Sequence, residues 1–239
     1  MAKSGRGQYP AADSEARSPP SATAMTTPAA SLVVPVRDEA GNIAPLVAEI
    51  HTALDAAGLT WELFLVDDGS ADGSWAEIEA LSLADTQVCG IRLDRGQGKS
   101  AALAAGFACC RGDRIVMLDG DGQDDPAEIP RMLSLLAGDG SRADLVNGWK
   151  TPRLDPWHKT MPSRVFNWLV GLFTGLWLHD HNCGLKAFRR DVMGSLQMSE
   201  GMHRFIPVLA AAEGFRVMEV HWRCICGGSG LSDRDPRHH

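Results

Sequence analysis

The segment Arg114–Pro126 reads RIVMLDGDGQDDP, an apolar run that ends in a cluster of aspartates and glycines. Its apolar part, Arg114–Leu118, has the length and the residue types of a buried strand. The segment Trp61–Ser70 (WELFLVDDGS) has the same form, with acidic residues directly after an apolar run. The two segments therefore predict two buried strands, each with carboxylates at its carboxyl end.

Strands and helices alternate along the chain around these two segments. Strands are predicted at Ser31–Val36, Trp61–Val66, Val88–Leu93 and Arg114–Leu118 and from Asp144 to Asn147, and helices at Asn42–Ala57, Ser74–Leu83, Lys99–Cys110 and Pro126–Leu136. Four alternations with short connections are typical of a mostly parallel sheet covered by helices. Ligands bind beyond the carboxyl ends of the strands in such sheets. We therefore expect a single α/β domain of Rossmann-like type with a ligand site at its acidic edge.

The composition is that of a globular protein with an acidic balance. The 239 residues are 44% hydrophobic and 22% charged, and the formal net charge is −7. These values exclude fibrous, collagen-like and wholly disordered chains. They also argue against a nucleic-acid-binding protein that works through bulk positive charge, so no nucleic-acid partner is expected.

The two ends of the chain differ from its middle. Residues 1–30 contain no Leu, Ile, Val or Phe, which predicts a disordered N-terminal tail. A folded domain is expected over residues 31–222, followed by an atypical tail at 223–239.

Six cysteines form no even framework, which favours reduced thiols in a cytosolic chain. The spacing Cys224-x-Cys226 lacks the second half of a zinc pattern.

The acidic segment after Leu118 has the residue types of a cation site. Asp119, Asp121 and Gln123 occupy alternate positions, so in an extended segment their oxygens point the same way. Mg²⁺ and Mn²⁺ take such oxygen ligands, commonly one or two carboxylates together with substrate phosphates. The alternative is an acidic turn that solvates a strand end.

The acids after the other strand, Asp67 and Asp68, can accept hydrogen bonds from ribose hydroxyls or from a base N–H. The alternative is helix capping by Ser70 or Asp72, and both roles can hold at once.

The segment Gly96–Ser100 (GQGKS) resembles part of a phosphate-binding P-loop, but Leu93 stands where that motif needs its first glycine. A P-loop ATPase is therefore not expected. Gly98 and Lys99 at a helix N-terminus can still face a phosphate.

A basic and apolar group of residues follows in the second half of the chain. Its cations are Lys150, Arg153, Lys159, Arg164, Lys186, Arg189, Arg190 and Arg204, and its aromatic residues are Trp157, Phe166, Trp168, Phe173 and Trp177. This combination suits a lipid headgroup at a membrane surface. The alternative is a core helix with snorkelling cations. The apolar run Val165–Leu178 is shorter than the roughly 18 residues that a membrane-spanning helix needs.

Five blocks, in this order, resemble glycosyltransferase family 2: VVPVRDEAGNI, LFLVDDGSADGS, RGQGKSAALAAGF, VMLDGDGQDDP and DHNCGLKAFRRDV. The similar branch is that of the dolichyl- and polyprenyl-phosphate sugar transferases, the dolichol-phosphate mannose synthase group. The match runs from about Leu32 to Val220. Each block alone is a weak signal, whereas five blocks in matching order and spacing are specific.

The resemblance implies a GT-A fold and an inverting, metal-dependent transfer of a hexose of mannose or glucose type. The donor would be a GDP- or UDP-linked sugar, the acceptor a polyprenyl or dolichyl phosphate, and the cofactor Mg²⁺ or Mn²⁺.

The resemblance also implies roles for individual residues. The nucleotide pocket comprises Pro35, Val36, Arg37, Glu39, Asp67, Asp68, Gly98, Lys99, Asp119 and Gly120. Asp119, Asp121 and Gln123 match the metal and diphosphate group. Lys150, Lys159, Ser163 and Arg164 fall where the family places acceptor-phosphate contacts. Asp121, Asp180 and Arg204 are the residues assigned to catalysis, Asp180 near the reacting sugar and Arg204 near the diphosphate.

The chain departs from the family pattern after about Val220. Relatives commonly continue with a V-x-H-x-x-R-x-x-G-x-S-K-like segment, whereas this chain reads EVHWRCICGGSGLSDRDPRHH. The C-terminal membrane helices of many relatives are also missing. We expect a cytoplasmic chain attached peripherally to the cytoplasmic face of a membrane. Two alternatives remain open, a family 2 enzyme with a non-lipid acceptor and an inactive nucleotide-sugar-binding protein. The sequence does not fix the oligomeric state.

Overall fold

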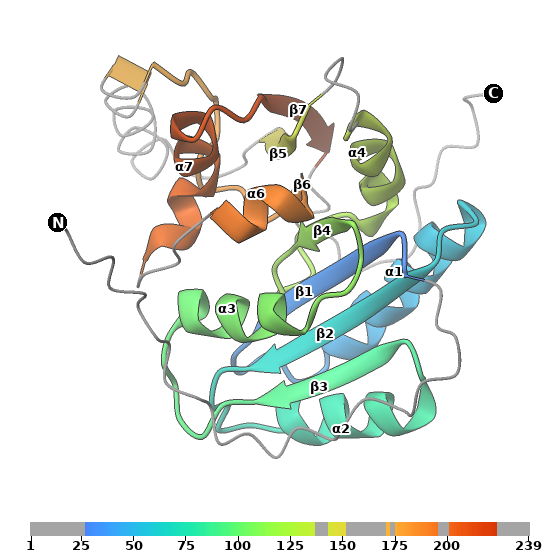
Figure 1. The fold of residues 1–239 in the computed structure, drawn as a ribbon. Coiled ribbons are helices and arrows are strands. Elements are labelled where there is room, and N and C mark those ends of the chain that lie inside the picture. Colours follow the sequence, from blue (N-terminus) through green and yellow to red (C-terminus); the bar gives the residue numbers. More distant parts are fainter. Residues whose placement is uncertain (1–26, 137–142, 152–170, 173–174, 196–200, 224–239) are drawn as a thin grey trace, which may run out of the picture.

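A computed structural model describes residues 27–136, 143–151, 171–172, 175–195 and 201–223. Its centre is a seven-stranded sheet with the strand order β3-β2-β1-β4-β6-β5-β7 (Figure 1). The first four strands along the chain are β1 (Ala30–Val36), β2 (Trp61–Asp67), β3 (Val88–Arg92) and β4 (Arg114–Met117). These four strands are mutually parallel, as the alternating pattern predicts.

The second half of the sheet contains one reversed strand. β5 (Leu145–Thr151), β6 (Lys186–Arg189) and β7 (Val217–Arg223) complete it. β6 is antiparallel to both β4 and β5, whereas β5 and β7 are parallel. The sheet is therefore mostly parallel, which confirms the predicted α/β class.

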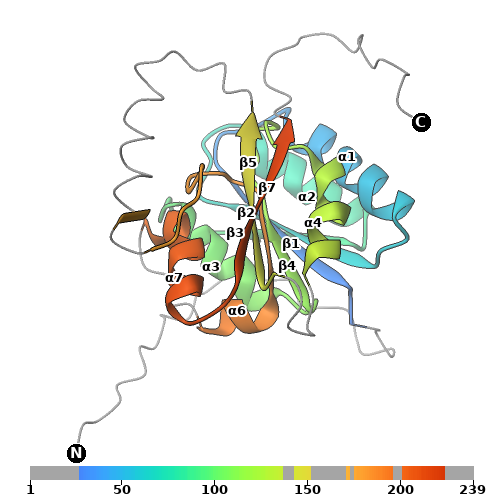
Figure 2. The same cartoon turned by 90° about the horizontal axis from the view of Figure 1, so that it is seen from above.

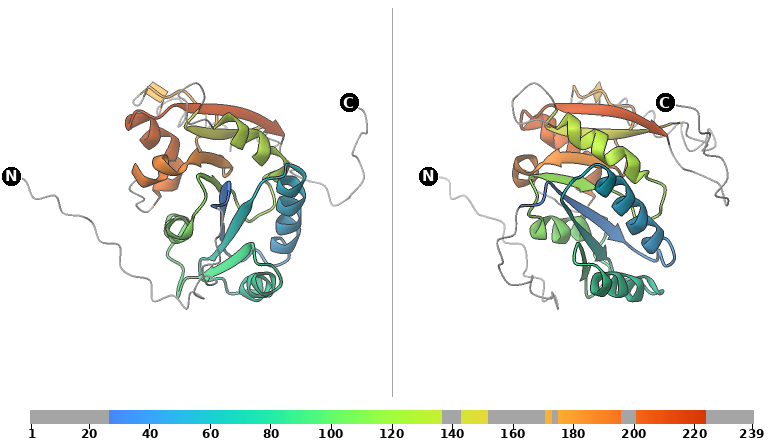
Figure 3. Two further views of the ribbon diagram at one scale, coloured as in Figure 1. Left: turned by 45° about the vertical axis from the view of Figure 1, so that its right-hand side comes forward. Right: turned by 90° about the vertical axis from the view of Figure 1, so that its right-hand side faces the viewer.

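Helices cover both faces of the sheet, as Figure 2 shows from above. One face carries α1 (Ile43–Ala56), α2 (Ser74–Ala84) and α4 (Ile129–Leu135), and the other carries α3 (Lys99–Cys109), α6 (Arg190–Ser195) and α7 (Ile206–Ala212). The right-hand view of Figure 3 brings α1, α2 and α4 toward the viewer.

The strand β1 shows why its residues read as a continuous apolar run. Leu32, Val34 and Val36 belong to the core on the side of α1 and α4, whereas Val33 belongs to the core on the side of α3. Successive side chains of a strand point to opposite faces. Since both faces are covered, both sets are apolar.

The observed boundaries differ slightly from the predicted ones. β1 begins at Ala30, inside the range assigned to the tail, because the amides of Ala29 and Ala30 donate to the carbonyl of Thr60. The helix predicted at Pro126–Leu136 divides into a 3₁₀ turn at Pro126–Glu128 and α4. The Asp125 carboxylate starts this turn by accepting a hydrogen bond from the Ala127 amide at 2.9 Å.

Some cations of the predicted basic group do not lie on the surface beside the acidic loops. Lys186 is only 1% exposed. Because β6 is reversed, Arg189 pairs with Arg114 at the start of β4 and lies at the edge opposite the acidic loops. Arg189 binds Asp144 and Asp191 there, and Arg190 donates to the backbone carbonyls of Gly112 and Cys110. The reversal of β6 could not be read from its four residues.

None of the helices in the described residues is long and apolar enough to cross a membrane. The predicted tails at 1–26 and 224–239, the pair Cys224-x-Cys226, and all of the run 165–178 except residues 171–172 and 175–178 lie outside the described residues.

Candidate active site

A cleft of about 310 Å³ lies at the carboxyl edge of the sheet. It is lined by Pro35, Val36, Arg37, Glu39, Asp68, Gly98, Lys99, Asp119, Gly120 and Asp121. These residues come from β1 and the loop after it, the loops after β2 and β4, and the N-terminal end of α3. Every lining residue belongs to the sets predicted for the nucleotide or the metal.

The loop after β1 is held in place by the loop after β2. The backbone of Asp38 has φ 56°, in the left-handed region that aspartate tolerates better than most residues. Its amide donates to Ser70 Oγ at 3.0 Å, and its carboxylate accepts from the Ala71 amide at 2.7 Å. The Glu39 amide donates to Ser74 Oγ at 2.8 Å. These bonds fix the cleft wall on the side of β1.

Asp68 organises the segment that leads into α3. Its carboxylate accepts hydrogen bonds from the Gln97 amide at 2.6 Å and from the Gly98 amide at 3.0 Å. The Arg37 guanidinium lies 3.4 Å from the same carboxylate. Gly98 has φ 90°, a conformation that favours glycine. Asp68 therefore positions the first turn of α3 against the cleft.

Asp67 is the predicted nucleotide-binding residue that does not line the cleft. It is 0% exposed, its Oδ1 accepts from the Ser70 amide at 3.0 Å, and its Oδ2 lies 3.4 Å from Arg92 Nε. The structure thus places Asp67 behind the cleft wall, as a support for the loop that holds Asp38.

The acidic loop after β4 brings a lysine and a carboxylate together. The Lys99 ammonium forms an ion pair with Asp119 Oδ1. The Asp119 amide donates to the buried carboxylate of Asp124 at 3.1 Å, and Asp121 Oδ1 accepts from the Gln123 amide at 3.0 Å. Asp119 and Asp121 both line the cleft, while Gln123 is exposed beside it.

The donor set fits a hard divalent cation. The carboxylates of Asp119 and Asp121 line the cleft and leave room for water and phosphate ligands, which Mg²⁺ and Mn²⁺ commonly retain. Within the described residues, no group of three or more His, Cys, Asp or Glu side chains is arranged to hold a metal.

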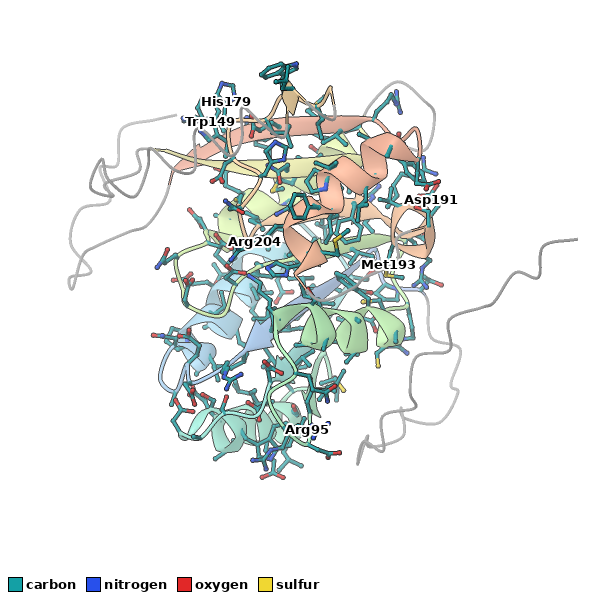
Figure 4. All side chains as sticks on the ribbon, turned by 90° about the vertical axis from the view of Figure 1, so that its left-hand side faces the viewer. Arg95, Trp149, His179, Asp191, Met193 and Arg204 are labelled. Atoms are coloured by element: carbon teal, nitrogen blue, oxygen red, sulfur yellow. The ribbon has the colours of Figure 1, made fainter. Side chains whose placement is uncertain are left out.

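The 3₁₀ turn Met202–Phe205 docks a histidine onto the start of α3. His203 Nδ1 lies 2.9 Å from Ser100 Oγ. Burial, together with the charges of Lys99 and Arg204, lowers the pKa of His203 to about 4, so the imidazole is neutral at pH 7. Arg204 is exposed and lies at the same edge as Trp149 and His179 (Figure 4). The family resemblance implied a role for Arg204 but did not indicate the contact between His203 and Ser100.

Asp180 is fixed from two strands. It is 1% exposed. The Glu219 carboxylate on β7 accepts from the amides of His179 and Asp180, both at 3.0 Å, and contacts His179 Nδ1 at 2.7 Å. Asn147 on β5 donates to the Asp180 carbonyl at 2.8 Å. Sequence reasoning missed Asn147 and Glu219, because nothing in their local pattern distinguishes them from other polar strand residues.

An aromatic stack lies next to this clamp. The rings of Trp149 and His179 are stacked with centroids 4.0 Å apart at 12° (Figure 4). Lys150, predicted to contact the acceptor phosphate, follows Trp149 on β5. The other predicted acceptor residues, Lys159, Ser163 and Arg164, lie outside the described residues.

The family model described as glycosyl transferase family 2 matches residues 31–196. The chain belongs to this family. The family 2 domain is 38% identical over 185 residues to a dodecaprenyl-phosphate galacturonate synthase of Rhizobium johnstonii, covering 76% of this chain and 54% of the relative. It is 34% identical over 191 residues to an undecaprenyl-phosphate 4-deoxy-4-formamido-L-arabinose transferase of Aeromonas hydrophila, covering 80% of this chain and 58% of the relative. The chain thus spans little more than half the length of these relatives.

Solved structures confirm the GT-A fold expected for the family 2 domain. A mannosyltransferase from Pyrobaculum calidifontis, in complex with GDP-Man and Mn²⁺, superposes with a TM-score of 0.61 at 19% identity, covering 83% of this chain and 56% of that chain. Glucosyl-3-phosphoglycerate synthase from Mycobacterium tuberculosis, with Mn²⁺ and UDP-glucose, gives 0.64 at 23% identity, covering 85% and 73%. The resemblance to polyprenyl-phosphate sugar transferases is confirmed by the relatives, although these name galacturonate and an arabinose derivative rather than mannose or glucose.

Proposed function

We propose that this domain transfers a sugar from a nucleotide sugar to a polyprenyl phosphate. The observation that carries the proposal is the cleft at the carboxyl edge, where Lys99, Asp119 and Asp121 meet. The names of the relatives support the same lipid-linked acceptor class.

The cleft suits the diphosphate of the donor. Gly98 and Lys99 begin α3, and a helix N-terminus with a nearby cation favours phosphate. Asp119, Asp121 and Gln123 would hold Mg²⁺ or Mn²⁺ beside that diphosphate. When bound, such a cation offsets the negative charge that develops on the departing nucleoside diphosphate. Arg204 adds positive charge at the same edge, whereas the neighbouring His203 is neutral.

The acceptor needs no strong base. A phosphate monoester has a second pKa of about 6 and is largely ionised at pH 7. Its oxygen attacks the anomeric carbon in line while the bond to the nucleoside diphosphate breaks, so the configuration inverts. Positioning by Lys150, Lys159, Ser163 and Arg164 can then suffice. Asp180 would hold a hydroxyl of the transferred sugar.

The acceptor's lipid tail must stay in a bilayer, so the domain would attach peripherally to the cytoplasmic face of the membrane. Residues 157–178 are proposed as the contact. Within the described part of this segment, Leu172 and Trp177 are 55% and 62% exposed. Large exposed apolar side chains beside basic residues are typical of interfacial attachment.

A radiolabelled donor panel tests the proposal. GDP-mannose, UDP-glucose and UDP-galacturonate, each labelled in the sugar, are incubated with polyprenyl phosphate and Mn²⁺. The proposal predicts that label from at least one donor moves into an organic-extractable product, with mannose or glucose donors preferred. In parallel reactions with a water-soluble acceptor in place of polyprenyl phosphate, transfer of label would instead favour a non-lipid acceptor. Nucleotide binding without any transfer would favour the inactive binding protein.

A further inference from the structure

The backbone of Gly184 presses directly on the Asp119 carboxylate. Gly184 lies in the buried turn between Asp180 and β6. A Cβ built at this position would lie 2.5 Å from Asp119 Cγ, 2.6 Å from Oδ2 and 2.7 Å from Oδ1. A real Cβ atom essentially never lies closer than 3.0 Å to a heavy atom outside its own residue and its chain neighbours. Position 184 therefore has room for hydrogen only.

The turn that carries Gly184 is held in place by hydrogen bonds and by burial. The buried Lys186 ammonium donates to the Cys183 carbonyl. The Gly148 amide of β5 donates to the Leu185 carbonyl at 3.0 Å. Cys183 and Leu185 are 2% and 0% exposed. Any added side-chain atom would thus displace the carboxylate rather than the turn.

The glycine is not required by backbone conformation. Gly184 is absent from the positive-φ glycines of the described residues, so alanine can adopt its backbone angles. The Asp119 side chain is 28% exposed and ends in a short, rotatable carboxylate. Its movement would cost the fold little. The tight contact therefore constrains the position of the Asp119 carboxylate more than it affects the stability of the fold.

We propose that Gly184 is a positioning residue that holds the Asp119 carboxylate, which also pairs with Lys99, in the orientation that the cation and diphosphate need. This inference rests on the proposed function of the cleft. With alanine at 184, the carboxylate must move by about 1 Å to reach ordinary contact distance, and misplacements of about 1 Å can cost 100-fold in an active site.

The test compares Gly184→Ala with Gly194→Ala. Gly194 lies in α6, and a Cβ there meets no atom within 4 Å. GDP and UDP are titrated calorimetrically with and without Mn²⁺, and thermal unfolding is followed in parallel. We expect Gly184→Ala to unfold near the wild-type temperature and to lose at least tenfold in Mn²⁺-dependent affinity. The Gly194→Ala control should keep the wild-type affinity.

The outcomes separate this inference from the proposed function. If the wild type binds neither nucleotide in Mn²⁺, the proposed function fails. If the wild type binds and Gly184→Ala binds equally well, the positioning role is overturned. Should Gly184→Ala unfold at a much lower temperature, the double variant with Asp119→Ala decides. If the double variant melts at the same temperature as Asp119→Ala alone, the result supports a clash with this carboxylate, because the stability effects of contacting residues are non-additive. If the double variant shows no such recovery of its melting temperature, the clash is overturned.

Discussion

At the scale of single residues, the neighbouring carboxylates of Asp67 and Asp68 have different surroundings and different hydrogen-bond partners. Asp68 lines the cleft and accepts from the amides of Gln97 and Gly98, whereas Asp67 is fully buried against Ser70 and Arg92. The sequence could predict that both acids follow β2. It could not predict which one faces the cleft, because that depends on the turn after the strand and on the segment from Arg92 to Gly98 that packs over it.

Substitution of Asp67 tests its link to the nucleotide. Asp67→Ala removes the acceptor of the Ser70 amide, and Ser70 in turn holds the backbone of Asp38. Because Asp67 lies behind the cleft wall, we expect an indirect loss of GDP or UDP binding, smaller than the about 1–3 kcal/mol for losing a direct charged hydrogen-bond partner. Arg92→Ala removes the ion pair of Asp67 but keeps the Ser70 bond, so a smaller loss of affinity than in Asp67→Ala would assign the effect to the Ser70 bond. Unchanged affinity of Asp67→Ala for both nucleotides would rule the role out.

His203 makes stability depend on pH. Its folded-state pKa of about 4 lies below the ordinary value of 6.5 because burial and nearby cations disfavour the imidazolium. The unfolded chain therefore binds more protons between these two values, and stability falls as the pH drops from 6.5 toward 4. Melting temperatures at pH 7 and pH 5 should differ less in His203→Gln than in the wild type. An equal drop in both proteins would show that His203 contributes nothing.

At the scale of elements, local patterns predicted the first four strands and the helices between them. β1 and β2 are buried on both faces, so their apolar runs are unambiguous. The short strand β6 contains only four residues, two of them basic, and its direction is set by pairing with β4 and β5. Asp68, Asp119 and Asp121 were predicted as site residues because they follow predicted strands. Pro35, Val36, Arg37 and Glu39 were implied only by the family resemblance. The clamp of Asn147 and Glu219 was not, because it joins residues far apart in sequence.

The clamp can be tested through Glu219. Its carboxylate accepts from the amides of His179 and Asp180 and contacts the His179 ring, and its side chain is 11% exposed. Glu219→Ala leaves two backbone donors without their acceptor, which should reduce the free energy of unfolding by about 1–3 kcal/mol. Urea denaturation provides the measurement, and Glu213→Ala, at an exposed glutamate after α7, should change it by less than about 0.5 kcal/mol. Equal stability of the two variants would contradict the clamp.

At the scale of the whole molecule, the proposed lipid acceptor requires a membrane contact. Trp177 is 62% exposed and packs its ring against Gly171, while Leu83 on α2 is 67% exposed elsewhere on the domain. Wild-type protein should float with anionic liposomes at low salt, and Trp168→Glu and Trp177→Glu should reduce flotation several-fold. Leu83→Glu, which also removes an exposed apolar side chain, should float as the wild type does. Wild type that stays in the soluble fraction would refute the attachment.

The central claim is that the cleft formed by the loops after β1, β2 and β4 and the start of α3 binds a nucleotide-sugar donor through a divalent cation. Calorimetric titration of GDP and UDP into the wild type and Asp121→Ala, with Mn²⁺ and with EDTA, tests it most directly. Asp121 lines the cleft, and within the described residues its carboxylate accepts a hydrogen bond from the amide of Gln123 in the same loop, so the variant should keep the fold. We predict Mn²⁺-dependent binding of at least one nucleotide by the wild type, abolished by EDTA and lost together with sugar transfer in Asp121→Ala. Undiminished binding in EDTA, or full transfer by Asp121→Ala, would contradict the account.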